Sequence, residues 1–434
     1  MGREYSRNVA GSLALKIASV GLSFLTSILL VRLLGRVEYG YFVYSIAWMQ
    51  LLVTFSLLGF DKLLVRLVST YKTRKSWGLM RGLIRRSNQI ILVIAVGIAA
   101  IAAGISWWRF SGSDMQMVNS LSIAMLSLPL AALMRLRLAI MQGLHKVFLG
   151  QLPESALRPV LFIGLIGLTY FLSPDSLNAP YALLLFLLSL SVALFVGIRM
   201  LIKALPESVN SAVSTNETNS WIKEAFPLLL VSGFAMLHAQ AEVLILVSIE
   251  GPDSLAGYHV AKRISQFIPL VFISVNLVLS PAVASLYAKK EMERLQRLVT
   301  NNARFVLLLA LPVALVFIFY GRLFLLLFGP EFTDGAPILT LLATGQLLNI
   351  LLGSVGLLLI MTGHSGDAVA GIGASAILNI LLSFILIPVM GNMGAAVAST
   401  SSLMAGNLFL SFRVWKRLGL HATALGPPKY YKKN

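Results

Sequence analysis

The stretch VAGSLALKIASVGLSFLTSILLV, residues 9–31, is long and apolar enough to cross a bilayer as one helix. A spanning helix needs about 20 mostly apolar residues, because the hydrocarbon core is about 30 Å thick and each residue advances the helix by about 1.5 Å. The stretch is too long for a signal-peptide core and has no small-residue cleavage pattern behind it. We therefore expect it to be a permanent first transmembrane helix.

Similar stretches recur along the whole chain, which is 57% apolar and only 12% charged over 434 residues. A soluble domain carries roughly twice that charged fraction, so the excess apolar surface must face lipid, and the expected fold class is all-α and polytopic. The chain has no cysteine, which excludes disulfides, thiolate catalysis and cysteine-bound metals. Twelve spans are predicted, at residues 9–31, 40–59, 87–105, 117–143, 155–172, 180–202, 225–249, 255–283, 303–326, 336–361, 368–388 and 394–413.

The positive charges predict the orientation of these spans. With both termini inside, 25 of the 35 Lys and Arg residues lie on the cytoplasmic side and only four lie outside. This asymmetry follows the positive-inside rule, so it explains most of the net charge of +18 without nucleic acid as a partner. The four outer cations are Arg32, Arg36, Arg109 and Arg322.

Two cytoplasmic stretches have the helical spacing of interfacial helices. In residues 60–72 and 289–299, apolar side chains recur every three or four positions, with basic side chains between them. Such helices commonly lie with the apolar face on the lipid and the basic face toward anionic headgroups. We expect both stretches to lie on the membrane surface.

The two halves of the sequence resemble each other at an offset of about 217–220 residues. Gly35-Arg-Val-Glu-Tyr-Gly-Tyr41 corresponds to Gly251-Pro-Asp-Ser-Leu-Ala-Gly-Tyr258, and Ile140-Met-Gln-Gly143 to Ile360-Met-Thr-Gly363. Six spans per half predict two lobes related by a pseudo-twofold axis along the membrane normal. The predicted organisation is an N-terminal lobe 1–204, a polar cytoplasmic linker 205–222, a C-terminal lobe 223–417 and a basic cytoplasmic tail 418–434.

Several segments near the ends of predicted spans have distinctive motifs. The first span ends in Leu29-Leu-Val-Arg-Leu-Leu-Gly-Arg-Val-Glu-Tyr-Gly-Tyr41, and the second in Leu57-Leu-Gly-Phe-Asp61 followed by Leu64-Val-Arg-Leu-Val68. In the second half, Ala241-Glu-Val-Leu-Ile245 leads to Gly257-Tyr-His-Val-Ala261. These segments resemble the corresponding segments of polysaccharide-type flippases of the multidrug/oligosaccharidyl-lipid/polysaccharide exporter superfamily.

This resemblance implies a transporter, not an enzyme, that works by alternating access on oligosaccharides carried by polyprenyl pyrophosphate. The implied location is the cytoplasmic membrane of a prokaryote, with membrane lipids as surroundings and polysaccharide polymerase and export proteins as candidate partners. The lipid II branch has two further helices, so twelve spans and the basic tail favour the O-antigen or exopolysaccharide type. No cofactor is implied apart from a coupling H⁺ or Na⁺.

Six cations fall inside the predicted spans, where each costs about 2.5–3.5 kcal/mol if it faces lipid. Glu242 is the one clear acid inside the spans, so it cannot pair them all. A pyrophosphate would supply the missing charge, because Arg binds phosphate through two hydrogen bonds and Lys binds it as a point charge. With Arg32 added from the resemblance, the candidate substrate-binding cations are Lys16, Arg32, Arg135, Arg137, Arg158, Lys262 and Arg263.

Several of these cations also have an ordinary interpretation, whereas Lys262 and Arg263 are hard to explain by the positive-inside rule. Lys16 continues a serine stripe on the first helix, which suits either a wet cavity or helix packing with the lysine snorkelling to the interface. Arg32 could equally be a headgroup anchor, and Arg158 could be topogenic. Arg135 and Arg137 are two residues apart, about 200° around a helix, so they cannot both face the same cavity.

Polar residues in the second half suggest an ion site. His238 and Glu242 are four residues apart and so share a helix face. A histidine and a carboxylate can exchange protons near neutral pH, which would allow H⁺ or Na⁺ coupling; a hydrogen bond that locks helix packing is the alternative. Asn379 forms another polar stripe with Ser375 and Ser383. The sequence fits sugar binding and helix packing equally well at this stripe.

Two other functions fit a polytopic protein. An ion-coupled drug or metabolite exporter of the same superfamily would need buried carboxylates, whereas the first helix has Lys16 and no acid. A membrane glycan polymerase or ligase would need a sizeable outer loop with catalytic residues. The predicted outer connections are short and have no cluster of Asp, Glu and His.

The topology can be tested with single cysteines, because the chain has none of its own. Asn210→Cys and Tyr430→Cys should resist an impermeant thiol reagent added to intact cells, since the linker and tail are predicted to be cytoplasmic. A cysteine in the outer connection 106–116 serves as the labelled control. Labelling of positions 210 and 430 from outside would refute the orientation.

Overall fold

The structure, a computed structural model, describes residues 2–173 and 176–427, without the side chains of residues 2–13, 16, 277 and 278. Every regular element in the described ranges is helical, as the apolar pattern predicts. The chain divides into two compact units, Met1–Met236 and Leu237–Asn434, with the boundary inside helix α9. The boundaries of the predicted lobes stay a prediction.

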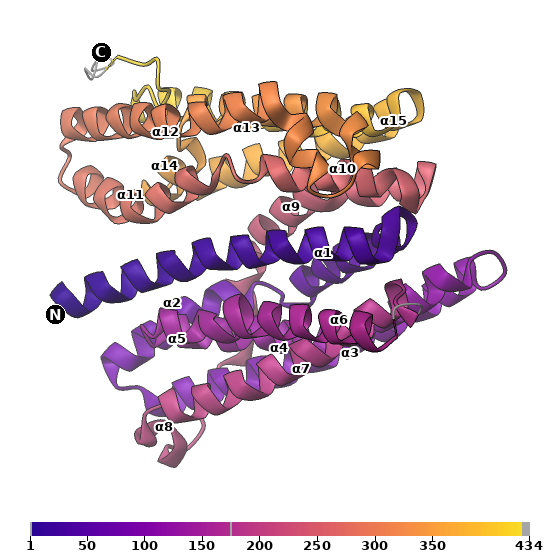
Figure 1. Cartoon of the computed structure of the whole chain (residues 1–434). Helices are drawn as coiled ribbons and strands as arrows, with labels where there is room; N and C mark the ends of the chain where they lie inside the picture. Colours follow the sequence, from indigo (N-terminus) through magenta and orange to yellow (C-terminus); the bar gives the residue numbers. More distant parts are fainter. Residues whose placement is uncertain (1, 174–175, 428–434) are drawn as a thin grey trace. The chain divides into compact units, whose positions relative to one another are not determined.

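Among its described residues, the first unit contains eight α-helices, a π-helical turn and the start of α9 (Figure 1). They are α1 Gly2–Ser56, α2 Phe60–Arg74, α3 Trp77–Phe110, α4 Met115–Gly143, α5 Val147–Leu152, the π-turn η1 Pro153–Leu157, α6 Arg158–Leu172, α7 Ala179–Ala204, α8 Glu207–Ser211 and α9 Thr218–Glu250. Helix α4 packs against α1, α2, α3 and α7. Its prominence in the core agrees with its large share of buried residues.

The second unit contains the end of α9 and the remaining elements. They are α10 Pro252–Ser265, α11 Leu270–Ala288, α12 Met292–Leu326, the 3₁₀ turn η3 Pro330–Gly335, α13 Ala336–Leu352, α14 Val355–Met361 and α15 Ser365–Leu418. Helix α13 packs against α10, α12 and α15.

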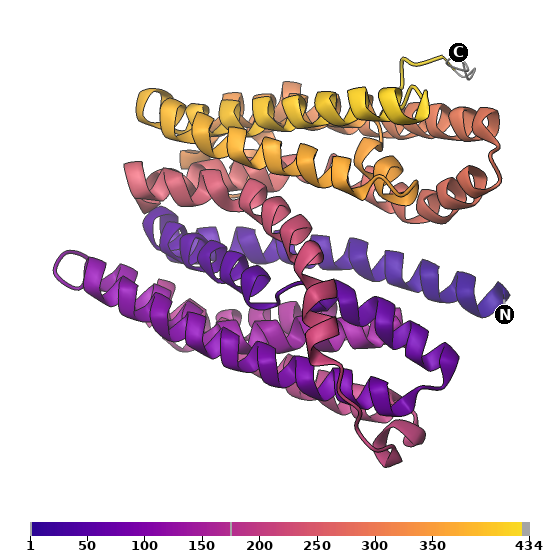
Figure 2. The same cartoon turned by 180° about the vertical axis from the view of Figure 1, so that it is seen from behind.

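Two of the long helices fold back on themselves at a glycine. Helix α1 is kinked at Gly35, with φ 78° and ψ 175°, and α15 at Gly391, with φ 57° and ψ −134°. Figure 2 shows the two arms of α15 lying side by side. A residue with a Cβ is strained at such φ values, so glycine allows the chain to reverse without a loop.

Nine helical segments of the described chain are long and apolar enough to cross a membrane, or ten if the bent pair within α11 counts as one span. Two of the nine, Val147–Leu172 and Pro330–Met361, each combine two α-helices with a π-helical or 3₁₀ turn. Two others, α1 and α15, each hold two predicted spans, one on either side of the kink. The observed set is therefore consistent with the twelve predicted spans. The predicted spans 255–283 and 336–361 are not single helices, since the first breaks after Ser265 and the second after Leu352.

The prediction of a surface helix at residues 60–72 is right about the helix and wrong about its surroundings. The apolar face of α2 packs against α4, and Phe60, Leu63 and Leu64 are fully buried. Trp221, at the start of α9, donates from its indole N–H to the Tyr71 hydroxyl at 3.2 Å. The apolar face of α2 is therefore covered by protein side chains and not by lipid.

The second predicted surface helix does not exist as a separate element. Residues 292–299 form the first two turns of α12 and bury Leu295 and Val299. The predicted linker 205–222 is likewise not a plain loop, because it contains α8 and the first turn of α9. The amphipathic pattern at residues 289–299 correctly indicates a helix, but it does not show that this helix continues to Leu326.

The first part of the predicted tail is docked onto the second unit. Leu420 and Ala422 are buried. The buried Gln296 side chain accepts from the His421 backbone N–H at 2.9 Å and donates to the His421 carbonyl at 2.8 Å. Arg304 Nε donates to the Ala424 carbonyl at 3.0 Å. Gln296 also donates to the Pro427 carbonyl at 3.1 Å, so these bonds hold the backbone against α12 as far as residue 427.

The kink in α1 can be tested with two glycines of the same helix. An added Cβ meets no atom within 4 Å at either Gly35 or Gly21, and only Gly35 has a positive φ. Gly35→Ala should therefore lower the free energy of unfolding by about 1–3 kcal/mol through backbone strain alone. Gly21→Ala should not lower it, because alanine is the better helix former. Thermal unfolding in detergent measures both; equal stability of the two variants would contradict the strain.

Candidate functional site

A buried carboxylate lies at the centre of a polar cluster in the second unit. Glu242 of α9 is 1% exposed, and its side chain contacts residues of α10 and α15. We define the Glu242 cluster by its hydrogen-bonded members: His238, Glu242, Tyr258, Lys262, Asn379, Ser383 and Ser399. Tyr258 and Lys262 are four residues apart, so α10 presents both on one face.

One oxygen of the carboxylate is saturated with donors. Lys262 Nζ lies 2.5 Å from Glu242 Oε1, in an ion pair whose lysine side chain is 18% exposed. The hydroxyls of Tyr258 and Ser399 also donate to this oxygen, at 3.3 and 3.4 Å. Lys262 donates in addition to the Ala239 carbonyl at 2.8 Å. The ammonium is thus held by oxygens of the chain itself.

The other carboxylate oxygen faces Asn379. The Asn379 amide nitrogen lies 3.0 Å from Glu242 Oε2, 3.0 Å from the His238 carbonyl oxygen and 3.1 Å from His238 Nδ1. Ser383 donates to the amide oxygen at 3.2 Å, which orients the amide with its nitrogen toward the acceptors. An amide carries two hydrogens, so it can serve two of these three acceptors at a time and links His238 to Glu242.

The cluster changes the meaning of two predictions. Lys262 is predicted as a pyrophosphate ligand and Glu242 as an ion-binding acid, yet the two are paired with each other. The pair is neutral as a whole. In this arrangement Glu242 takes no further cation, and Lys262 takes no anion, unless the pair first opens.

A second group of charges lies in the first unit, around the π-turn η1. Arg158 follows this turn, and its guanidinium stacks over the Phe186 ring at 5.2 Å. Glu154 of the turn and Arg135 of α4 are both within electrostatic reach of Arg158. Arg135 and Arg158 are half-buried. Three arginines and one glutamate, counting Arg137, leave the group with a net positive charge.

Arg137 is the most deeply placed of the predicted cations. It is 2% exposed, and its Nη2 donates to the Gly150 carbonyl at 2.6 Å. Its side chain packs on Gly197, where an added Cβ would come within 2.7 Å of Nε. In the described part of the chain, Nε and Nη1 have no hydrogen-bond partner. As the spacing predicts, Arg137 and Arg135 differ in their surroundings.

The remaining predicted cations are Arg263, Arg32 and Lys16. Arg263 is half-buried on α10 beside Lys262, and Arg32 is exposed near the kink of α1. The side chain of Lys16 lies outside the described part of the structure. Their predicted roles stay predictions.

Sequence reasoning missed Tyr258, Ser399 and Glu154. A signal was present for Tyr258, because it precedes Lys262 by four residues and ends one of the repeated motifs. Ser399 sits in a run of four hydroxyl residues that singles out none of them, and Glu154 falls just outside the predicted fifth span. Only the packing of α10 and α15 on α9 brings the first two to Glu242.

Solved structures of membrane transporters have the same fold as this chain. An inward-facing multidrug resistance transporter of the MATE family in the MOP superfamily superposes with a TM-score of 0.75, at 13% identity over 94% of both chains. The lipid II flippase MurJ in an inward closed conformation gives 0.72, at 16% identity over 92% of this chain and 87% of that one. A MOP superfamily transporter from Pyrococcus furiosus gives 0.65, at 12% identity over 96% and 97%. The fold is that of this superfamily of multi-pass membrane transporters.

The family follows from the sequence itself. The profile described as polysaccharide biosynthesis protein matches residues 6–287, and the MatE profile matches residues 226–385. The probable low-salt glycan biosynthesis flippase Agl15 of Haloferax volcanii is 25% identical over 200 residues, which cover 44% of this chain and 42% of that protein. The chain belongs to the polysaccharide biosynthesis protein family, the polysaccharide branch of the superfamily, as the resemblance predicts.

The ion pair in the Glu242 cluster predicts a double-mutant pattern. Lys262→Met leaves a buried carboxylate without its cation and should lower the free energy of unfolding by about 3–5 kcal/mol. Lys262→Met with Glu242→Gln should recover much of that loss, because neither partner is then charged. Thermal unfolding in detergent measures the cycle.

The exposed pair of Arg66 and Glu224, whose side chains are 58% and 42% exposed, is the matched control. The same two changes at that pair should alter stability by about 1 kcal/mol or less. If Lys262→Met is as stable as the parent, the buried pair is not formed.

Proposed function

We propose that the protein flips polyprenyl-pyrophosphate-linked oligosaccharides from the cytoplasmic to the outer leaflet of a prokaryotic cytoplasmic membrane, by alternating access. The observation that carries this proposal is the family match over residues 6–287. The part of Agl15 that matches belongs to a protein named as a probable glycan biosynthesis flippase, and a lipid II flippase has the same fold. Both termini are proposed to be cytoplasmic.

Within this proposal, Arg135 and Arg158 bind the pyrophosphate. They are the half-buried members of a group that has more arginines than acids, and an arginine can bind a phosphate through two parallel hydrogen bonds. Arg137 is a positioning residue, because its side chain is already tied to the Gly150 carbonyl. Lys16, Arg32 and Arg263 remain candidate ligands, and Asn379, which bonds to Glu242, is a less suitable sugar ligand than the sequence suggests.

The Glu242 cluster suggests how an ion gradient could be coupled to flipping. If a pyrophosphate oxygen draws Lys262 away, Glu242 is left as a buried unpaired carboxylate, which is costly unless it binds H⁺ or Na⁺. Substrate and ion would then both stabilise the state in which the Glu242–Lys262 ion pair is broken. Directionality requires that the ion bind two conformations with different affinity, and opening of the pair supplies that difference. Passive flipping, driven by removal of product outside, is the alternative.

An ion-coupled drug or metabolite exporter is the second candidate. The MatE match and the buried Glu242 favour it. Lys262 disfavours it, because the carboxylate that would bind a cationic drug or ion is already neutralised. We propose a transporter and not a glycan polymerase or ligase, with the lipid-linked glycan, membrane lipids and polysaccharide polymerase or export proteins as partners.

Purified protein in liposomes tests the proposal with a fluorescent polyprenyl-pyrophosphate-linked glycan. Arg158→Gln should slow flipping at least about tenfold, since one lost bidentate charge-assisted contact is worth more than about 1.4 kcal/mol. Arg158→Lys should be intermediate, because a point charge remains. Arg199→Gln, which changes an exposed arginine elsewhere in the same unit, is the control. Normal flipping by Arg158→Gln at equal abundance would remove this site from the proposal.

The same vesicles test coupling. A pH or Na⁺ gradient should change the final distribution of the glycan in the parent and not in Glu242→Gln. If neither gradient has an effect, and Glu242→Gln behaves like the parent, the cluster is packing and flipping is passive.

A further inference from the structure

An elongated apolar groove lies in the first unit between α1, α3 and α4, with a volume of about 360 Å³. Its lining comes from one face of each helix, because the residues are three or four positions apart along the chain. Eleven of the twelve lining side chains carry no charge; the lining is Tyr44, Trp48, Leu52, Ile98, Ile101, Ala102, Ile105, Ser106, Arg109, Phe110, Leu121 and Met125.

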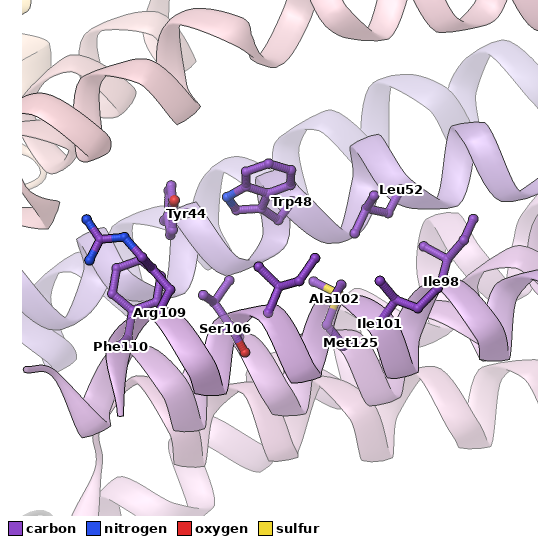
Figure 3. Close-up of a pocket in the computed structure, with 12 residues that line it drawn as sticks. Tyr44, Trp48, Leu52, Ile98, Ile101, Ala102, Ser106, Arg109, Phe110 and Met125 are labelled. Atoms are coloured by element: carbon purple, nitrogen blue, oxygen red, sulfur yellow. The ribbon is translucent and has the colours of Figure 1, made fainter. Parts of the chain in front are cut away.

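The groove is apolar at one end and cationic at the other (Figure 3). Leu52 and Ile98 lie at the apolar end, and Arg109, Phe110 and Tyr44 lie at the opposite end. The one hydroxyl of the central part, Ser106 Oγ, already donates to the Ala103 carbonyl at 2.8 Å. Apart from this hydroxyl and the indole N–H of Trp48, the middle of the groove is lined by apolar side chains, which suits a hydrocarbon.

The length of the groove equals about one leaflet of a bilayer. From Ile98 to Phe110, α3 advances twelve residues, or about 18 Å, and half of the hydrocarbon core is about 15 Å. Trp107 and Trp108, 59% and 82% exposed, lie at the same level as Arg109. Exposed tryptophans mark the headgroup region, so Arg109 is at headgroup depth while the groove runs inward from it.

Arg109 has a charge that the topology does not explain. It belongs to the four cations predicted on the outer side, against the positive-inside rule. Its guanidinium stacks over the Phe110 ring at 5.5 Å, and in the described part of the chain it forms no ion pair with an acidic side chain. A cation at the headgroup end of an apolar groove is complementary to a lipid phosphate.

We propose that the groove is a binding site for one anionic phospholipid of the outer leaflet, with an acyl chain between α1, α3 and α4 and the headgroup phosphate on Arg109. The occupant is a resident membrane lipid and not the transported glycan carrier. The groove is only as long as one leaflet, and its single cation offers less than a pyrophosphate requires. Bound lipid would fill the gap between these helices and fasten the outer half of α3 to the second arm of α1.

Photo-crosslinking in nanodiscs tests the site. The probe is phosphatidylglycerol with a diazirine in one acyl chain, compared with phosphatidylcholine carrying the same group, and crosslinked residues are mapped by mass spectrometry. Phosphatidylglycerol should label the segments 44–52 and 98–106 several-fold more than phosphatidylcholine. It should show no such preference at Val93, which is 72% exposed on another face of the same helix.

Two variants separate the headgroup from the chain. Arg109→Gln should remove the preference for phosphatidylglycerol, whereas Arg322→Gln, which changes another predicted outer cation, should keep it. Ala102→Trp should reduce labelling by both probes because it fills the middle of the groove, and Val93→Trp should not.

Equal labelling of the groove by both lipids, or a preference that survives Arg109→Gln, would overturn the proposal and leave ordinary annular lipid. Displacement of the probe by polyprenyl pyrophosphate at far lower concentration than by unlabelled phosphatidylglycerol would also overturn it, because the occupant would then be the carrier. Neither result bears on whether the protein flips glycans, which the liposome assay measures separately.

Discussion

Hydrocarbon provides no hydrogen bonds, and this constraint determines most of the structure. Each backbone N–H and C=O within the membrane must bond inside its own helix, so the chain reverses at a few specialised residues and not in long loops. At Gly35 and at Gly391 two helical arms join through a non-helical glycine, with no loop between them. Near the start of α12, Gln296 and Arg304 satisfy backbone groups of the segment that follows α15.

The same constraint explains why the membrane charges are found in groups. Glu242 and Lys262 neutralise each other, and Tyr258, Asn379 and Ser399 supply the remaining hydrogen bonds. Around the π-turn η1 the balance differs, since the arginines outnumber Glu154. One unit therefore contains a satisfied, neutral cluster, and the other contains a positive one. The two halves of the sequence resemble each other, but the charges of these two groups differ.

How far the candidate site could be predicted is clearest at Lys262. Its position within a span marked it as a costly charge, and Glu242 was recognised as the one clear acid, but their separation of twenty residues gave no sign that they touch. His238 and Glu242 were paired by helical spacing, whereas the structure joins them through Asn379 from α15. Helical periodicity relates residues on one helix; it carries no information about which face meets which neighbour.

The sequence by itself determined the all-α membrane fold, the family and the residues with unusual charge, because span length and hydropathy depend on the bilayer more than on packing. Only the tertiary structure decided that α2 is covered by protein, that α12 begins at residue 292, and that Arg137 is held by a carbonyl of α5. It also decided the lining of the apolar groove, where Tyr44 and Arg109 come from different helices. These features depend on contacts between residues far apart in the chain, and a local pattern of apolar and polar side chains is compatible with many such arrangements.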